Sequence, residues 1–293
     1  MSQSPVHHFN LVLVTRLLLM LESRFHFFLQ TLRKSRLARN ASHQINIQRN
    51  SSDKASKSSI TRSRRLDETP LFYITKPDQL SSLKTHLSKQ NEIAIDVEAV
   101  QNSAALLQIS TRTADYIVDP LFLWTEIAIL NPVMLDANIV KVLHGSENDI
   151  KWLRWNLNLT IVNLFDTQAA QWELGLSQKS ESLKDTIQTY CGVELNKSIN
   201  HQKWKRRPLT TEQFQYARQD THYLLEVYDV LRAKFSEEMR ELYDIRCAHF
   251  LHGMTADNRT SEGEIQQRQV QRWCADAREA VAPSPDIKKF YSL

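Results

Sequence analysis

The stretch Glu92-Ile-Ala-Ile-Asp-Val-Glu98 decides the fold class, because apolar and polar positions alternate along it. A period of two predicts a β-strand whose successive side chains point to opposite faces. One face is then apolar, and the other holds Ala94, Asp96 and Glu98. The two carboxylates lie about 7 Å apart along the strand, and their repulsion disfavours two charges there unless a cation lies between them. A solvated Asp-x-Glu pair on an exposed strand is the alternative.

Patterns of further strands and helices lie on both sides of this strand. The additional strands are expected at Leu71 to Thr75, Ala105 to Ser110, Asp115 to Val118 and Val140 to Leu143. The helices are expected at Pro77 to Lys89, Glu147 to Trp155, Thr167 to Leu174, Ser182 to Tyr190 and Glu212 to Phe235. Strands that later alternate with helices predict an α/β fold, in which helices flank a mixed sheet.

A further carboxylate, Asp149, follows a predicted strand that passes through His144 and Gly145 into a helix. We expect Ser146 to cap that helix, which makes Asp149 the third helical residue and turns it back toward the end of the strand. Taken alone, this pattern is equally typical of an ordinary capping box.

The last expected helix carries a phenol and a carboxylate four residues apart, Tyr216 and Asp220. Residues at this spacing share one face of a helix, so both can address the same bound water. Thr210 and Gln213 fit a capping box that specifies where the helix begins. A Tyr-Asp pair on the protein surface is the alternative reading of these two residues.

Composition excludes several function classes. The 293 residues contain only five glycines, and no two are close enough to form a phosphate-binding loop of the P-loop or dinucleotide type. The three cysteines are widely spaced without a CxxC motif, which favours a reducing compartment over a disulfide framework. Because 42% of the residues are hydrophobic, a wholly disordered chain is also excluded.

The net charge of +4 conceals a division within the chain. Residues 1–65 hold 12 Lys and Arg against two acidic residues, a net of +10, whereas the remainder holds 25 against 31. The expected organisation is a basic segment over 1–65 that is disordered or directs targeting, a folded domain over 66–235 and a helical tail over 236–293. The acid-poor, Arg- and Ser-rich leader is typical of an organelle transit peptide, or of nuclear-import or nucleic-acid patches. Its apolar run is too short to predict a membrane span.

The carboxylates and the tyrosine, in this order, resemble the tyrosine branch of the DEDD superfamily of 3′-5′ exonucleases. Residues 69–229 are most similar to the ribonuclease D family, in particular to the eukaryotic exosome-associated exonucleases. The phrases that carry this resemblance are Glu-Ile-Ala-Ile-Asp-Val-Glu, Leu-Gln-Ile-Ser-Thr-Arg, Val-Leu-His-Gly, Asn-Asp-Ile-Lys-Trp-Leu, Asn-Leu-Phe-Asp-Thr, Arg-Pro-Leu and Tyr-Ala-Arg-Gln-Asp-Thr-His-Tyr.

This resemblance implies an RNase H-like sheet and two divalent cations, Mg²⁺ or Mn²⁺, held by four carboxylates. By analogy, Asp96, Glu98 and Asp220 hold the ion that carries the attacking hydroxide, and Asp96 and Asp149 hold the ion beside the leaving 3′-oxygen. Tyr216 orients the attacking water and helps to deprotonate it. Single-stranded RNA is the implied substrate, an exosome-like complex the implied partner, and the nucleus the implied compartment, with a mitochondrion or plastid as the alternative.

The loop from Lys197 to Arg207 combines cations with an aromatic residue, which suits single-stranded nucleic acid. Lys197, Trp204 and Arg207 are the candidate contacts, and the alternative is a solvated loop in which Trp204 plugs the core. Lys203 stands where the family usually has an aspartate. The hairpin after Glu98 is several residues shorter than in the family, which predicts weaker substrate affinity or a lower rate.

Two rival functions remain open at this point. One is a related exonuclease that acts on DNA, since the sequence does not show a contact to a 2′-hydroxyl group. The other is a non-hydrolytic nucleic-acid-binding scaffold, which the shortened hairpin favours and the intact carboxylates oppose. The expected tail over 236–293 carries at most part of a nucleic-acid-binding module.

Overall fold

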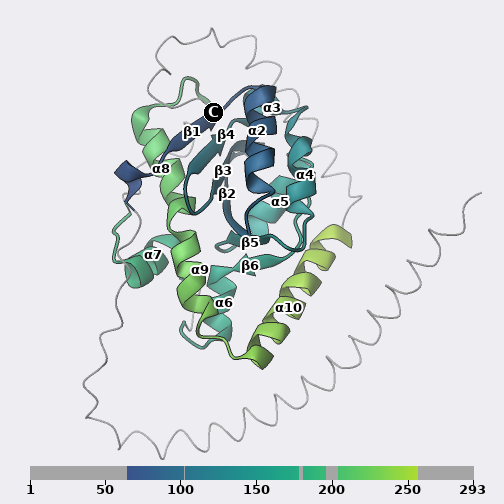
Figure 1. The fold of residues 1–293 in the computed structure, drawn as a ribbon, viewed down its shortest axis with the longest axis vertical. Coiled ribbons are helices and arrows are strands. Elements are labelled where there is room, and N and C mark those ends of the chain that lie inside the picture. Colours follow the sequence, from purple (N-terminus) through teal and green to yellow (C-terminus); the bar gives the residue numbers. More distant parts are fainter. Residues whose placement is uncertain (1–64, 102, 178–180, 196–203, 257–293) are drawn as a thin grey trace, which may run out of the picture. The chain divides into compact units, whose positions relative to one another are not determined.

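The computed structural model describes residues 65–101, 103–177, 181–195 and 204–256 (Figure 1). The basic segment, Lys197 and most of the expected tail lie outside these residues. The fold is built on a mixed six-stranded sheet. In spatial order its strands are β1 (Leu71–Ile74), β4 (Asp115–Val118), β3 (Ser103–Ser110), β2 (Glu92–Val100), β5 (Val140–Leu143) and β6 (Leu164–Asp166).

The central strands β2, β3 and β4 are antiparallel to their neighbours within this group. The outer pairs are parallel: β1 pairs with β4, β5 pairs with β2, and β6 pairs with β5. The helices are α2 (Pro77–Leu87), α3 (Pro120–Leu123), α4 (Asn131–Met134), α5 (Glu147–Trp155), α6 (Thr167–Glu173), α7 (Leu183–Cys191), α8 (Thr211–His222), α9 (Leu224–Arg232) and α10 (Glu237–Ala256). The expected α/β class, with an RNase H-like mixed sheet flanked by helices, is therefore confirmed.

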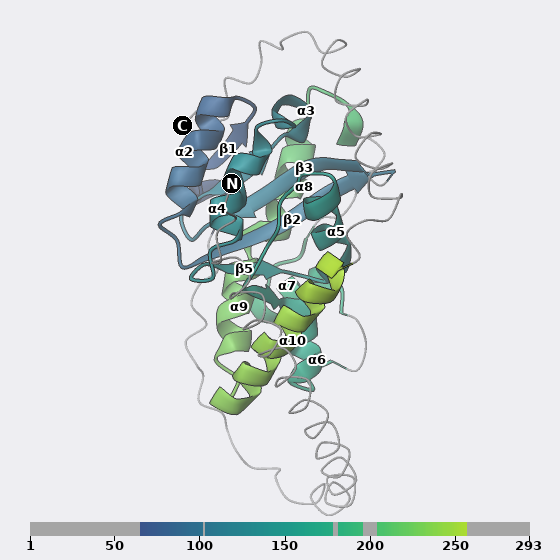
Figure 2. The same ribbon diagram turned by 90° about the vertical axis from the view of Figure 1, so that its right-hand side faces the viewer.

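Helices cover both faces of the sheet, and α8 and α5 lie on opposite sides of β2 and β3 (Figure 2). The apolar face of β2, with Ile95 and Val97, belongs to the main core together with Ile150 and Leu153 of α5. On the other face, a second apolar cluster joins the sheet to α8 and contains Leu106, Ile117, Phe214 and Ala217. The alternation in Glu92 to Glu98 thus separates one buried face from a face that α8 crosses.

The expected single helix over Glu212 to Phe235 is wrong in one respect, because the structure divides it into α8 and α9 at Tyr223. The two halves pack against different parts of the sheet. Helix α8 lies on β2, β3 and β4, whereas α9 lies on β2 and β5 and contacts α6 and α7. Because the helix is interrupted at Tyr223, residues 211–232 contact strands from β4 to β5, which a single straight helix would not reach.

The expected domain boundary at 235 falls inside the packed unit, because α10 contacts β6. Three α10 side chains, Tyr243, Cys247 and Leu251, are buried in the main core. The Tyr243 hydroxyl accepts the backbone N–H of Asp166 and donates to its carbonyl oxygen, at 2.8 and 2.7 Å. The first part of the expected tail is therefore a structural part of the domain.

Candidate active site

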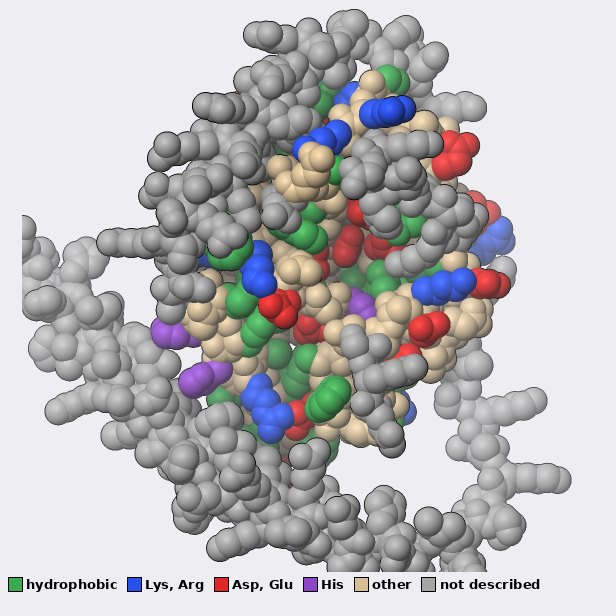
Figure 3. Space-filling view, turned by 180° about the vertical axis from the view of Figure 1, so that it is seen from behind, with side chains coloured by type: hydrophobic (Ala, Val, Ile, Leu, Met, Phe, Trp, Pro, Cys, Tyr) green, Lys and Arg blue, Asp and Glu red, His purple; other side chains and the backbone are tan. Residues whose placement is uncertain are grey.

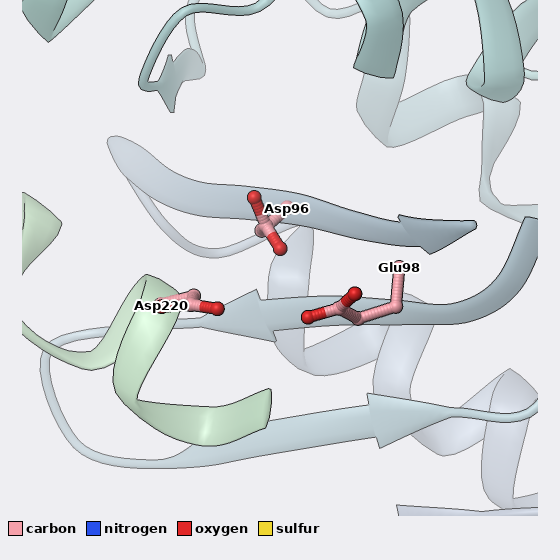
Figure 4. Close-up of side chains that lie close together, drawn as sticks. All are labelled: Asp96, Glu98 and Asp220. Carbon is pink, nitrogen blue, oxygen red and sulfur yellow. The ribbon is translucent and has the colours of Figure 1, made fainter. Parts of the chain in front are cut away.

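Three carboxylates converge where α8 crosses the sheet (Figure 4). Asp96 and Glu98 come from β2 and Asp220 comes from α8, and each offers an oxygen within 4.8 Å of the others. Glu98 and Asp220 are buried, and Asp96 is partly exposed. Acidic side chains gather near the middle of one face of the molecule, with Lys and Arg side chains around them (Figure 3).

The local backbone explains why the two β2 carboxylates lie side by side. Asp96 and Glu98 are two residues apart, so the strand period puts them on one face. A bulge changes the pairing of β2 with β3 between Glu98 and Ala99, immediately after the second carboxylate. Bulges increase the local twist and redirect side chains, and they are frequent beside active sites.

Asp149 reaches the same strand from the opposite side of the sheet. It is the third residue of α5, as expected, and its carboxylate accepts a hydrogen bond from the backbone N–H of Val97. That N–H is accessible because β5 pairs with β2 only over Glu92–Ala94, which leaves the rest of this edge of β2 without a neighbouring strand. The fourth carboxylate thus lies beside the backbone of Asp96 without belonging to the group of three.

The turn before α5 depends on two features that position Asp149. Gly145 has a φ of 63°, and a Cβ there would lie 3.3 Å from the Gln168 side chain. Ser146 occupies the N-cap position, as expected, but its hydroxyl makes no capping hydrogen bond. The Asp166 carboxylate instead accepts the N–H groups of Gly145 and Ser146 at 3.0 and 2.8 Å, while it also caps α6. This support was missed in the sequence, where Asp166 appeared only as the residue before a predicted helix.

Burial raises the pKa of Asp149 to about 7, and the charges of Asp166 and Asp220 act in the same direction. The folded chain therefore holds this proton more tightly than the unfolded chain, whose carboxyl group has its ordinary pKa near 3.8. The contribution of Asp149 to stability is consequently greatest in acid and decreases as the pH rises from about 4 to about 7.

We expect Asp149→Asn to raise the melting temperature in EDTA more at pH 8 than at pH 5. The asparagine resembles the protonated acid at pH 5, whereas at pH 8 it removes a buried charge that neighbouring carboxylates repel. Thermal melts of both proteins at the two pH values test this expectation. An equal difference in melting temperature at pH 5 and pH 8 would contradict the assigned shift.

Tyr216 lies one helical turn before Asp220 on α8, as expected. Burial raises the pKa of its phenol well above the usual value, and the charges of Asp220, Glu98 and Asp96 raise it further. Without bound cations the phenol stays protonated, so it can donate a hydrogen bond and orient a water through its lone pairs. The indole of Trp204 packs beside the ring, with the two ring centroids 5.8 Å apart.

A buried polar network fixes α8 against the sheet. The Asp115 carboxylate accepts from Arg218 at 2.6 Å and contacts the His222 ring at 2.8 Å. The Ser110 hydroxyl donates to Asp115 at 2.8 Å and lies 2.7 Å from the Thr221 hydroxyl. These contacts hold the helix on both sides of Asp220, so the rotation of α8 that presents its carboxylate is determined by partners on β3 and β4.

The structure buries the side chains of Trp204 and Arg207, the two candidate nucleic-acid contacts that lie within the described residues. Trp204 has no exposed surface, which matches the alternative of a core plug. The Arg207 side chain is 1% exposed and pairs with the Asp119 carboxylate, which also accepts a hydrogen bond from the Tyr73 hydroxyl. Arg207 further donates to the carbonyl oxygens of Ala105 and Trp204, at 3.0 and 2.6 Å. It therefore anchors the loop beside Tyr216, and no sequence signal linked it to Asp119.

Residues 71–236, more than half of the chain, match the family described as 3′-5′ exonuclease. The chain belongs to the 3′-5′ exonuclease family. Membership in this exonuclease family implies the use of divalent cations, and the converging carboxylates offer the oxygen ligands that hard cations prefer.

Related proteins match a little more than half of this chain. Exosome complex component 10 from Rattus norvegicus is 42% identical over 179 residues, which are 59% of this chain and 20% of that protein. Protein RRP6-like 1 from Arabidopsis thaliana is 39% identical and covers 60% of this chain and 28% of that protein. The chain thus matches 20 to 28% of the length of these relatives.

Solved structures show the same fold as this exonuclease. The catalytic core of RRP6 from Trypanosoma brucei has a TM-score of 0.60 at 36% identity, over 65% of this chain and 54% of that one. RNase D from Escherichia coli has a TM-score of 0.56 at 23% identity, over 72% and 62% of the two chains. At that lower identity the similarity to RNase D establishes the fold alone.

Proposed function

We propose that this chain is a metal-dependent 3′-5′ exoribonuclease, which releases nucleoside 5′-monophosphates in RNA processing or decay. The observation that carries the proposal is the convergence of Asp96, Glu98 and Asp220 beside Tyr216, with Asp149 on the neighbouring edge of β2. RNA is favoured over DNA because the relatives at 36 to 42% identity are named as an exosome component and as RRP6.

Each side chain has a role in this proposal. Asp96, Glu98 and Asp220 would hold one cation, and Asp96 and Asp149 would hold a second. Two divalent cations, Mg²⁺ or Mn²⁺, supply positive charge that stabilises the entering and leaving oxygens of the phosphodiester. The protonated Tyr216 accepts a hydrogen bond from the attacking water or donates one to it, and so holds the water in line with the scissile bond.

The proposed setting is a nuclear, exosome-like complex. Its support is the resemblance to exosome complex component 10, which covers 59% of this chain and 20% of that protein. The organelle alternative rests on residues 1–65, which lie outside the described part of the chain. Among the described residues, no helix combines the length and apolar character needed to cross a membrane.

We expect the purified chain to shorten single-stranded RNA from its 3′ end in Mg²⁺ or Mn²⁺ and to leave it intact in EDTA. The measurement uses 5′-labelled RNA and DNA of one sequence, together with identification of the released nucleotide. A circular RNA of that sequence is the control, because it has no 3′ end and should persist. Equal cleavage in EDTA would refute metal dependence, faster cleavage of DNA would favour the DNA rival, and cleavage of neither would favour the scaffold.

A further inference from the structure

Gln108, in the middle of β3, has no exposed surface, and neither its amide oxygen nor its amide nitrogen has a hydrogen-bond partner among the residues that the structure describes. It is the only glutamine or asparagine among the described residues in which both side-chain atoms are buried without a partner. A buried amide without hydrogen bonds destabilises the folded state, because it leaves water and gains nothing in return. An unpaired buried polar group therefore calls for a physical explanation.

The sheet register puts this amide beside the acidic cluster. Gln108 is paired directly with Asp96 on β2 and with Ile117 on β4. Directly opposed residues of antiparallel strands share one face, with their Cβ atoms about 5 Å apart. Gln108 and Asp96 thus occupy neighbouring positions on the same face of the sheet.

That face is the one that α8 crosses. Leu106, two residues before Gln108 on β3, packs in the cluster that contains Tyr216. Ser110, two residues after Gln108, contacts the Thr221 hydroxyl through its own hydroxyl. Gln108 therefore lies between the two places where β3 meets α8. The amide has no exposed surface, and its directly paired strand partner on the same face is Asp96, whose carboxylate is the candidate acceptor for its N–H.

We infer that Gln108 is a positioning residue that donates an amide N–H to the Asp96 carboxylate when that carboxylate binds a divalent cation. This inference rests on the proposed function. Carboxylates that bind metal ions are themselves usually hydrogen-bonded, and such a bond restricts the orientation of the ligand oxygen. The unpaired amide is then a cost of the cation-free state that is relieved on cation binding.

The test replaces Gln108 by Met, which keeps the approximate length and removes both polar atoms. In EDTA, Gln108→Met should melt at the same temperature as wild type or at a higher one. The Mn²⁺ concentration at the midpoint of the ion-induced melting shift should rise by about tenfold or more, the usual effect of removing such a supporting bond. Hydrolysis at low Mn²⁺ should fall and should recover in part at high Mn²⁺.

Leu107→Met is the matched control, because Leu107 directly precedes Gln108 on β3 and packs in the main core on the other face of the sheet. Exchanges of Leu for Met usually cost little stability. Gln108→Leu repeats the test if the methionine variant folds poorly. A midpoint within twofold of wild type in the folded variants, or an equal increase in Leu107→Met, would overturn the inference. If wild type itself shows no Mn²⁺-induced shift, the proposed function fails instead, so the two failures are distinguishable.

Discussion

Asp96→Asn is expected to abolish both hydrolysis and the rise in melting temperature that divalent cations give the wild-type chain. Asp96 is the one carboxylate assigned to both cations, and an amide carries no charge to attract them. At cation concentrations about a hundred times the dissociation constant, binding stabilises a folded chain by about 2.7 kcal/mol. For a domain of this size, that corresponds to a rise of roughly 5 to 10 °C.

The expected loss of activity is about 10³-fold or more, which is roughly 4 kcal/mol of transition-state stabilisation. In EDTA the variant should melt no lower than wild type, since the substitution relieves repulsion among the carboxylates. Asp78→Asn, an exposed change in the first turn of α2, serves as the control and should retain both the shift and the activity. Full activity of wild type in EDTA, or an undiminished shift in Asp96→Asn, would refute the assignment.

Tyr216→Phe is expected to lower the single-turnover rate by about 10²-fold or more while cation and RNA affinities stay close to wild type. The substitution removes one oxygen that orients the water, and this scale is usual for a positioned acid-base group, corresponding to roughly 3 kcal/mol. The phenylalanine ring keeps its packing against Trp204, so the site retains its shape. Rates and binding are compared at one fixed salt concentration, because phosphate binding depends on salt.

Tyr116→Phe provides the matched comparison for this variant. Tyr116 is buried on the other face of the sheet, where its ring stacks on Phe72. Removal of its hydroxyl should leave the single-turnover rate within a few-fold of the wild-type rate. A scaffold would show no hydrolysis in any of the proteins. If Tyr216→Phe cleaves as fast as wild type, the phenol only packs and the catalytic tyrosine is assigned wrongly.

Local patterns in the sequence predicted most of the elements that carry the site. Alternation identified β2 and the shared face of Asp96 and Glu98, and the capping box formed by Thr210 and Gln213 identified the start of α8. Strand β6 was missed because its three residues are too few to show a period. Its pairing with β5 is a tertiary contact that a local pattern does not contain.

The positions of charged groups that pair over long distances could not be predicted in the same way. Arg207 looked like a surface cation because the loop around it is basic, yet its partner Asp119 lies 88 residues earlier in the chain. Gln108 looked like part of an apolar strand because its neighbours in the sequence are apolar. In contrast, the approach of Asp220 to Asp96 was inferred from the family resemblance. Helix and strand periods predict which side chains share a face of one element, but they do not predict which elements pack together.

The phenol of Tyr243 affects whether the edge strand β6 can pair with a strand of another molecule. Strand β6 is at the margin of the sheet, and a margin with free N–H and C=O groups is a template on which another chain can add a strand. Here one hydroxyl engages both backbone groups of Asp166, and the helix that carries it packs along the strand. The Tyr243 hydroxyl thereby occupies two backbone groups that an added strand could use, at the residue whose carboxylate also supports the turn before Asp149.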